Sequence, residues 1–196
     1  MTGRIKRAMK LAAVAFCALW LSACASDKMA QLSTAPVEAT VPPQGQSTMV
    51  FFRSSYFGGA IQSSVFDVTD AAPKFIGIVS AGKKIAYAMP AGERRMMAIG
   101  ENASFLDVEA EAGKIYYARI SPRMGLWKAR FELEPVPVSE AGIKDEVAEC
   151  EWVGNTDASL AWANQNVQSI NSKMIEYLPD FENNPNRAKL LAGDGG

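Results

Sequence analysis

The chain has 196 residues, with 20 Lys or Arg, 21 Asp or Glu and no His, which gives a formal net charge of -1. This balance argues against nucleic acid as a partner, because nucleic-acid-binding domains carry clustered basic charge. The lack of His excludes Ser-His and Cys-His catalysis and leaves only unusual metal sites. We therefore expect a protein that is not an enzyme and that uses no metal or other cofactor.

The first 24 residues predict a lipoprotein signal. Residues 1–10 carry four basic residues and no acid, and the apolar stretch 11–21 that follows is about half the roughly 20 residues needed to span a bilayer. Leu21-Ser22-Ala23-Cys24 comes next and resembles the lipobox of bacterial lipoproteins. In that family the Cys sulfur takes a diacylglyceryl group and the bond before it is cut. The resemblance implies that residues 1–23 are removed and that Cys24 is the lipid attachment site.

Cys24 has two other interpretations. The general signal peptidase could cut after Ala23, leaving an ordinary secreted protein. A disulfide from Cys24 would have only Cys150 as a partner, because Cys17 leaves with the signal. Cys150 itself lies beside Trp152, which favours a buried, inert thiol over a disulfide between two chains.

The segment that follows Cys24 is predicted to be a flexible tether covering residues 24–46. Residues 25–46 lack periodicity and are rich in Ala, Thr, Gln and Pro. Removing the four basic residues of positions 1–10 leaves 16 basic and 21 acidic residues. Lipid chains rather than basic side chains would therefore attach the protein to the membrane. In lipoproteins of two-membrane bacteria, Ala at position 25 favours the outer membrane, facing the periplasm.

Residues 47–136 predict a β-sandwich, because short alternating apolar runs are separated by Gly and Pro. Residues 137–196 then predict a helical extension. A short helix is expected over 139–149 and a longer one over 157–178, capped by Thr156 or Asp157 and ended by Pro179. Its apolar stripe favours docking within a monomer over pairing with another chain. The polar residues after it are expected to be frayed. The eight expected strands cover residues 48–53, 64–69, 74–80, 84–90, 94–100, 104–111, 114–121 and 129–136.

Three segments of the sandwich resemble a family of bacterial lipoprotein β-domains of unknown function. They are Phe52-Arg53-Ser54 after the first strand, the stretch from Gly77 to Gly92, and Ala112-Gly113-Lys114-Ile115-Tyr116-Tyr117. Pro90-Ala91-Gly92-Glu93 is also similar to a turn of carboxypeptidase-regulatory and PEGA-like β-domains, although Arg94 stands where those domains usually have His. The resemblance covers about residues 47–136. It implies an immunoglobulin-like or prealbumin-like β-sandwich and an envelope location, and it supplies no activity.

Two residue patterns have a weak chemical interpretation. Ser80 and Lys83 match the S-x-x-K pattern of Ser nucleophiles, but flanking strands place them on a hairpin rather than on a helix. Asp107, Glu109 and Glu111 share one strand face at a spacing too wide for one cation, so a solvated face is favoured.

Five residues form the candidate partner-binding set and flank two loops, 54–62 and 121–127, that combine aromatic, Gly and Arg residues. They are Arg53, Tyr56, Arg119, Arg123 and Trp127. The competing interpretation is that Phe57, Met124 and Trp127 close the ends of the sandwich. The sequence thus predicts a monomeric, lipid-anchored periplasmic protein that binds an envelope protein or glycan. An envelope hydrolase, or an inhibitor of one, is the alternative.

Overall fold

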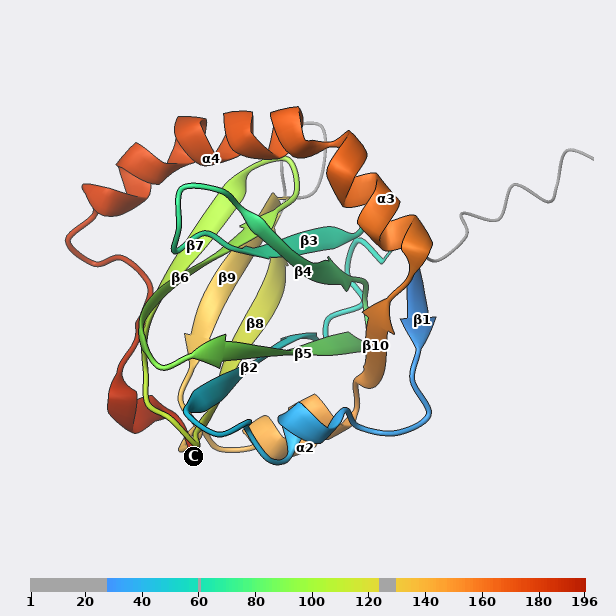
Figure 1. Cartoon of the computed structure of the whole chain (residues 1–196), viewed down its shortest axis with the longest axis vertical. Coiled ribbons are helices and arrows are strands. Elements are labelled where there is room, and N and C mark those ends of the chain that lie inside the picture. The colour runs from blue at the N-terminus through green and yellow to red at the C-terminus, as the bar shows by residue number, and fades with distance from the viewer. Residues whose placement is uncertain (1–27, 60, 124–129) are drawn as a thin grey trace, which may run out of the picture.

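The computed structural model describes residues 28–59, 61–123 and 130–196, and the signal segment with Cys24 lies outside them. Two mixed sheets pack face to face, and the long helices follow near the C-terminus (Figure 1). This architecture confirms the predicted mainly β sandwich with a C-terminal helical extension. None of the helices in the described residues is long and apolar enough to cross a membrane.

The described strands form a six-stranded and a five-stranded sheet. Most neighbours are antiparallel, whereas β2 with β8, β10 with β5 and β11 with β7 are parallel pairs. The larger sheet has the order β1 (Met29–Gln31), β10 (Glu151–Asn155), β5 (Lys83–Pro90), β2 (Gln46–Arg53), β8 (Ile115–Arg123) and β9 (Arg130–Val136). The smaller sheet has the order β11 (Lys189–Leu190), β7 (Ala103–Ala110), β6 (Gly92–Ile99), β3 (Ser63–Asp67) and β4 (Lys74–Val79).

The eight strands expected from alternation and turn residues all occur, with ends shifted by no more than about two residues. Gly82, in the turn before β5, adopts a positive φ angle of 69°, and Gly92, the first residue of β6, adopts one of 115°. Residues with a Cβ rarely adopt these angles, so both glycines fix where one strand stops and the next begins.

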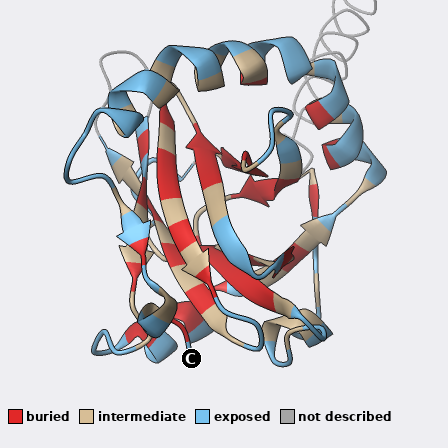
Figure 2. Ribbon diagram, turned by 60° about the vertical axis from the view of Figure 1, so that its left-hand side comes forward, coloured by how far each residue is buried: buried red, intermediate tan, exposed pale blue. Residues whose placement is uncertain are grey.

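The five-stranded sheet is buried on the face toward the larger sheet and, beneath helix α4 (Val167–Glu182), on part of its outer face. Leu106 and Val108 of β7 point into the core between the sheets, together with Phe51 and Ile120 from the larger sheet. On the opposite face, helix α4 covers a second cluster, which includes Ile170. Figure 2 shows the buried strands beneath helices whose outer surfaces are exposed. The apolar stripe predicted for this helix therefore docks within the chain. The sheet residues beneath it are Phe66, Val68, Met97, Ile99, Ala103 and Phe105.

The helical region differs in detail from the prediction. The expected helix over 157–178 is two helices, α3 (Asp157–Gln165) and α4, which meet at Asn166. Pro179 lies inside α4 and does not end it, because its carbonyl still accepts a hydrogen bond from Asn183 N at 3.0 Å. The predicted cap at Thr156 is present, with its side chain accepting from Ser159 N. The shorter elements are η1 (Val37–Ala39), α2 (Ile143–Ala148) and η2 (Ala192–Asp194).

The prediction of a flexible tether over residues 24–46 is wrong for the described part of that segment. Met29 is buried, and Met29–Gln31 pairs with β10 as the edge strand β1. Leu32 N continues the ladder with a 2.8 Å bond to Trp152 O. A three-residue edge strand carries too little periodicity to be recognised in a sequence, because its hydrogen bonds are supplied by residues more than 100 positions away.

The C-terminal end also differs, because it is built into the fold rather than frayed. Leu190 in β11 is fully buried, and β11 pairs with β7. Gly196 exchanges two backbone hydrogen bonds with Ile115, of 2.8 and 3.1 Å. Both ends of the described chain are therefore built into the fold, from Met29 in β1 to Gly196 beside β8.

Polar side chains close the sandwich where the two sheets leave unpaired strand edges. Asn102 accepts from Phe131 N and donates to Phe131 O, at 3.0 and 3.1 Å, and Ser104 Oγ accepts from Leu133 N at 3.0 Å. These contacts join the start of β7 to the edge strand β9. Across the opposite opening, Asn155 Nδ2 donates to Ile76 O at 2.8 Å. Such bridges satisfy edge groups that would otherwise pair with another chain.

The buried C-terminal strand predicts a large difference between two adjacent leucines. Leu190→Ala removes a fully buried side chain and should lower the free energy of unfolding by about 2–5 kcal/mol. Leu191→Ala is the matched control, because Leu191 is exposed and should change stability by less than about 0.5 kcal/mol. Urea denaturation measures both. Equal, small effects would show that the C-terminal strand does not belong to the fold.

Candidate partner-binding surface

Arg53 was predicted to contact a partner, but the structure places it inside the protein. Its side chain is fully buried, with the guanidinium 5.0 Å from the centre of the Phe131 ring. Burial lowers the pKa of Arg53. The guanidinium donates to the carbonyls of Ile61 at 2.6 Å, Phe57 at 2.7 Å and Gly58 at 3.1 Å. Arg53 therefore holds the following loop from beneath and is not available to a partner.

The loop that Arg53 holds, residues 54–59, 61 and 62, is called here the Tyr56 loop. Tyr56, Phe57 and Ile61 are its exposed large apolar residues. Tyr56 lies over the turn before β5, where an added Cβ on Gly82 would come within 2.5 Å of the Tyr56 hydroxyl oxygen. Of the predicted set, Tyr56 is thus placed on an open surface, and its neighbours Phe57 and Ile61 were not in that set as contacts.

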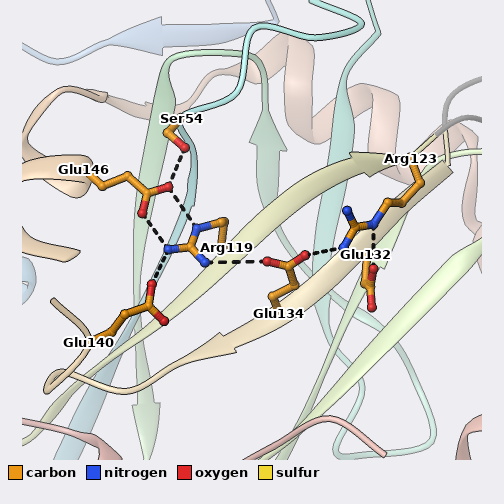
Figure 3. A network of polar contacts seen from close by, with 7 residues as sticks. All are labelled: Ser54, Arg119, Arg123, Glu132, Glu134, Glu140 and Glu146. Carbon is orange, nitrogen blue, oxygen red and sulfur yellow. Dashed lines mark hydrogen bonds and ion pairs between the residues drawn. The ribbon is translucent and has the colours of Figure 1, made fainter. Parts of the chain in front are cut away.

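Arg119 is the centre of an ion-pair network next to Ser54, the first residue of the Tyr56 loop (Figure 3). Its guanidinium donates to Glu146 Oε1 at 2.9 Å and Oε2 at 2.5 Å, and to Glu140 Oε1 at 2.6 Å. Ser54 Oγ donates to the same Glu146 carboxylate at 2.6 Å. The hydrogen bonds from Arg119 lower the pKa of Glu146, and those to Glu146 raise the pKa of Arg119. Arg119 therefore fixes helix α2 against the sheet.

Arg123 is the most exposed of the predicted arginines. It donates to Glu132 at 2.7 Å and to Glu134 at 2.8 Å, both on the neighbouring strand β9. Glu134 also lies 3.6 Å from Arg119, which joins the two arginines into one network. Arg123 thus shares one of its two partners with Arg119, and 57% of the Arg123 side chain remains exposed.

The four predicted residues that the structure describes do not form one face. Tyr56 and Arg123 are exposed in different places, Arg53 is internal and Arg119 is largely committed to Glu140 and Glu146. Trp127 lies outside the described residues. The sequence did not indicate Glu146 as a member of the Arg119 network. Glu146 is 92 positions away from Ser54, and nothing in the local sequence indicates such a pairing.

A second charged cluster, also missed by the sequence, surrounds Asp67 in β3. Arg94 Nη2 donates to Asp67 Oδ2 at 2.6 Å, the Tyr87 hydroxyl donates at 2.9 Å, and Thr69 donates to Oδ1. Burial alone would raise the pKa of Asp67, but these hydrogen bonds outweigh it and hold the pKa below its usual value. Burial and Asp67 together raise the pKa of Tyr87. Arg94, which replaces the His of the similar turn, is therefore a structural partner of Asp67.

The residues with a weak chemical interpretation are each paired separately. Ser80 Oγ accepts from Gln62, whereas Lys83 Nζ pairs with Glu151, so the S-x-x-K pair does not act as a unit. The three strand carboxylates do not converge either, and no metal-binding group of His, Cys, Asp or Glu was found among the described residues. The acids pair as Asp107 with Arg95 and Arg187, Glu109 with Lys189, and Glu111 with Lys114.

Cys150 is buried, as the inert-thiol interpretation expects. Its thiol lies 3.7 Å from Glu146 O, and burial raises its pKa. Lys84 is buried nearby and donates to Val147 O at 2.6 Å, with its ammonium 4.7 Å from the centre of the Trp152 ring. A thiol with a raised pKa in this site is a poor nucleophile.

Comparison with known proteins gives little further constraint. No protein-family model matches the chain. Over 139 residues the chain is 29% identical to an uncharacterized protein of Haemophilus influenzae. The aligned region covers 69% of this chain and 80% of that protein. The name of that protein states no activity, so the resemblance to lipoprotein β-domains stays a prediction and the function has to be argued from the surface.

The Arg119 network predicts an acid-sensitive stability. Glu146 has a lowered pKa in the folded state, so its contribution is complete above the ordinary Glu pKa of roughly 4.3 and is lost as the pH falls through the folded value. Glu146→Gln should therefore destabilise the protein at pH 7 by about 1–3 kcal/mol and by much less near pH 3. Glu149→Gln is the control, because Glu149 is exposed and lies at the C-cap of the same helix. Urea denaturation at both pH values measures the difference, and a pH-independent effect of Glu146→Gln would contradict the assignment.

Proposed function

We propose that the protein is a lipid-anchored envelope lipoprotein that binds another envelope component and has no chemistry of its own. The observation that carries this proposal is the order of a basic segment, an apolar stretch of about half the length of a membrane span and the Leu21-Ser22-Ala23-Cys24 sequence. Cys24 is then the acceptor of the lipid. Ala25 directs the protein to the outer membrane, where the sandwich faces the periplasm.

We propose no catalytic role for the side chains of the two weak chemical patterns, because each is engaged in a separate contact. Ser80 and Lys83 have different partners, and Asp107 is held by two arginines. A hydrolase needs a nucleophile or carboxylate whose proton can move during the reaction, together with a group that takes the proton. Residues engaged in separate, strand-bracing ion pairs do not provide that arrangement.

The partner surface that we favour is the exposed β8–β9 end of the Arg119 network, with Arg123 and Glu132 as its outermost residues. Both side chains are more than half exposed, and they offer a guanidinium and a carboxylate within 2.7 Å of each other. Rim charges of this kind steer and select a partner more than they add affinity. Since β9 and β1 are opposite edges of the six-stranded sheet, this surface lies away from the N-terminal side of the domain.

One experiment in intact cells tests the anchor and the partner surface together. A photocrosslinking residue at position 123 should capture an envelope component, and the same residue at Lys74, on the far edge strand β4, should not. The wild-type protein should incorporate labelled palmitate. In the Cys24→Ala variant both the palmitate label and the position-123 crosslink should be lost, because the protein is no longer held at the membrane.

Two results would contradict the proposal. Palmitate labelling that persists in Cys24→Ala would exclude Cys24 as the lipid site. Equal crosslinking from positions 123 and 74 would exclude the β8–β9 end as the partner surface.

A further inference from the structure

The first described residue lies very close in the sequence to the proposed lipid site. Only residues 25–27 separate Cys24 from Lys28. A chain spans at most about 3.6 Å per residue, so the Cα atoms of Cys24 and Lys28 are at most about 14 Å apart. A lipid on Cys24 places that residue at the headgroup layer of a bilayer. This inference rests on the proposed lipid anchor, and it means that Lys28 also lies at or just above the headgroups.

Lys28 is fixed to the folded domain. Thr156 Oγ1, at the start of α3, donates to Lys28 O at 2.6 Å. The next residue, Met29, is buried and pairs with Asn155 of β10. The sandwich therefore has no long tether on which to move away from the membrane, and the side of the domain around Lys28 faces the bilayer.

The surface around Lys28 is hollow and largely apolar. Lys28 and Trp162 line a depression of about 310 Å³ together with Ile61 of the Tyr56 loop. The loop extends from there along β10, because Tyr56 covers Gly82 and Gly82 O accepts from Glu151 N at the other end of that strand. In Figure 1 this loop, β10, β1 and the start of α3 lie on one side of the molecule.

The exposed aromatic and aliphatic residues of the Tyr56 loop suit a membrane interface. Tyr56, Phe57 and Ile61 are 75%, 56% and 38% exposed. Tyr prefers the headgroup level, where its ring is in an apolar layer and its hydroxyl in water, and Phe anchors interfacial segments. A contact through such residues also fits the acidic balance of the chain after position 23, which provides no polybasic patch for anionic lipids.

Arg53 makes this loop a fixed surface rather than a mobile one. Its guanidinium holds three carbonyls of the loop from inside the protein, and Gln62 Nε2 donates to Ser80 Oγ at 2.9 Å at the end of the loop. The Tyr56 loop therefore loses most of its conformational entropy when the protein folds, and it loses little more when it contacts the membrane.

We propose that the Tyr56 loop rests on the bilayer that holds the Cys24 lipid, with Tyr56, Phe57 and Ile61 in the headgroup region. This contact gives the domain one orientation. The β1 edge of the larger sheet faces the membrane, and the β9 edge with Arg123 faces the periplasm.

Spin-label depth measurements test this orientation. The full, lipidated protein carrying Cys150→Ala is placed in vesicles of phosphatidylethanolamine and phosphatidylglycerol, with a nitroxide at Phe57→Cys or Ile61→Cys. Oxygen concentrates in the bilayer and a nickel chelate stays in water. On vesicles the oxygen-to-nickel accessibility ratio should rise several-fold at both positions relative to the same protein in detergent.

The control label is placed at Leu191→Cys, an exposed apolar residue in the C-terminal segment that pairs beside β7 rather than beside β1. Its ratio should not change on vesicles. Mass spectrometry of the same samples establishes whether Cys24 carries lipid. Lipidated protein whose positions 57 and 61 stay as accessible to nickel as position 191 would overturn the orientation alone, and would point to a protein partner for the loop. Protein without lipid on Cys24 would overturn the proposed anchor and the orientation with it.

Discussion

The structure depends on the pairing of β10 between β1 and β5 in the larger sheet. This one strand joins residues from the N-terminal segment, the middle of the sandwich and the C-terminal region. Helix α2 precedes β10 in the chain and α3 follows it, so the position of β10 also determines where both helices lie. Because β10 ties Lys28 to the start of α3, the domain begins only a few residues after Cys24, and the proposed membrane orientation follows from that constraint.

Several charged residues in the described part of the chain serve the fold. Arg53 supports a loop, Arg119 holds α2 on the sheet, and Arg94 neutralises a buried Asp67. Surface ion pairs contribute little on average, but pairs that are partly buried and share hydrogen bonds brace the elements that they connect. Two of the exposed surfaces differ in character, because the Tyr56 loop is apolar and the β8–β9 end is charged. That difference is the physical basis for assigning them to a membrane and to a partner.

The eight strands between residues 46 and 136 could be predicted because each follows an apolar or alternating run and the runs are separated by turn residues such as Gly82. The strands β1, β10 and β11 could not, since they have two to five residues and are defined by distant partners. For the candidate site, the exposure of Tyr56 and Arg123 could be anticipated from their loops. The burial of Arg53 could not, because its hydrogen-bond acceptors are backbone carbonyls, which every sequence has.

Hydrogen exchange at Leu32 tests the central claim most directly. Its amide donates to Trp152 O and belongs to the segment that composition alone assigns to a tether. If β1 and β10 are part of the fold, this amide in the full chain should exchange with a protection close to that of the core strands β2 and β8, allowing for some fraying at a sheet edge. Exchange at the rate of an unstructured peptide would contradict the account, because the domain would then be separated from Cys24 by a long tether and would have no fixed orientation at the membrane.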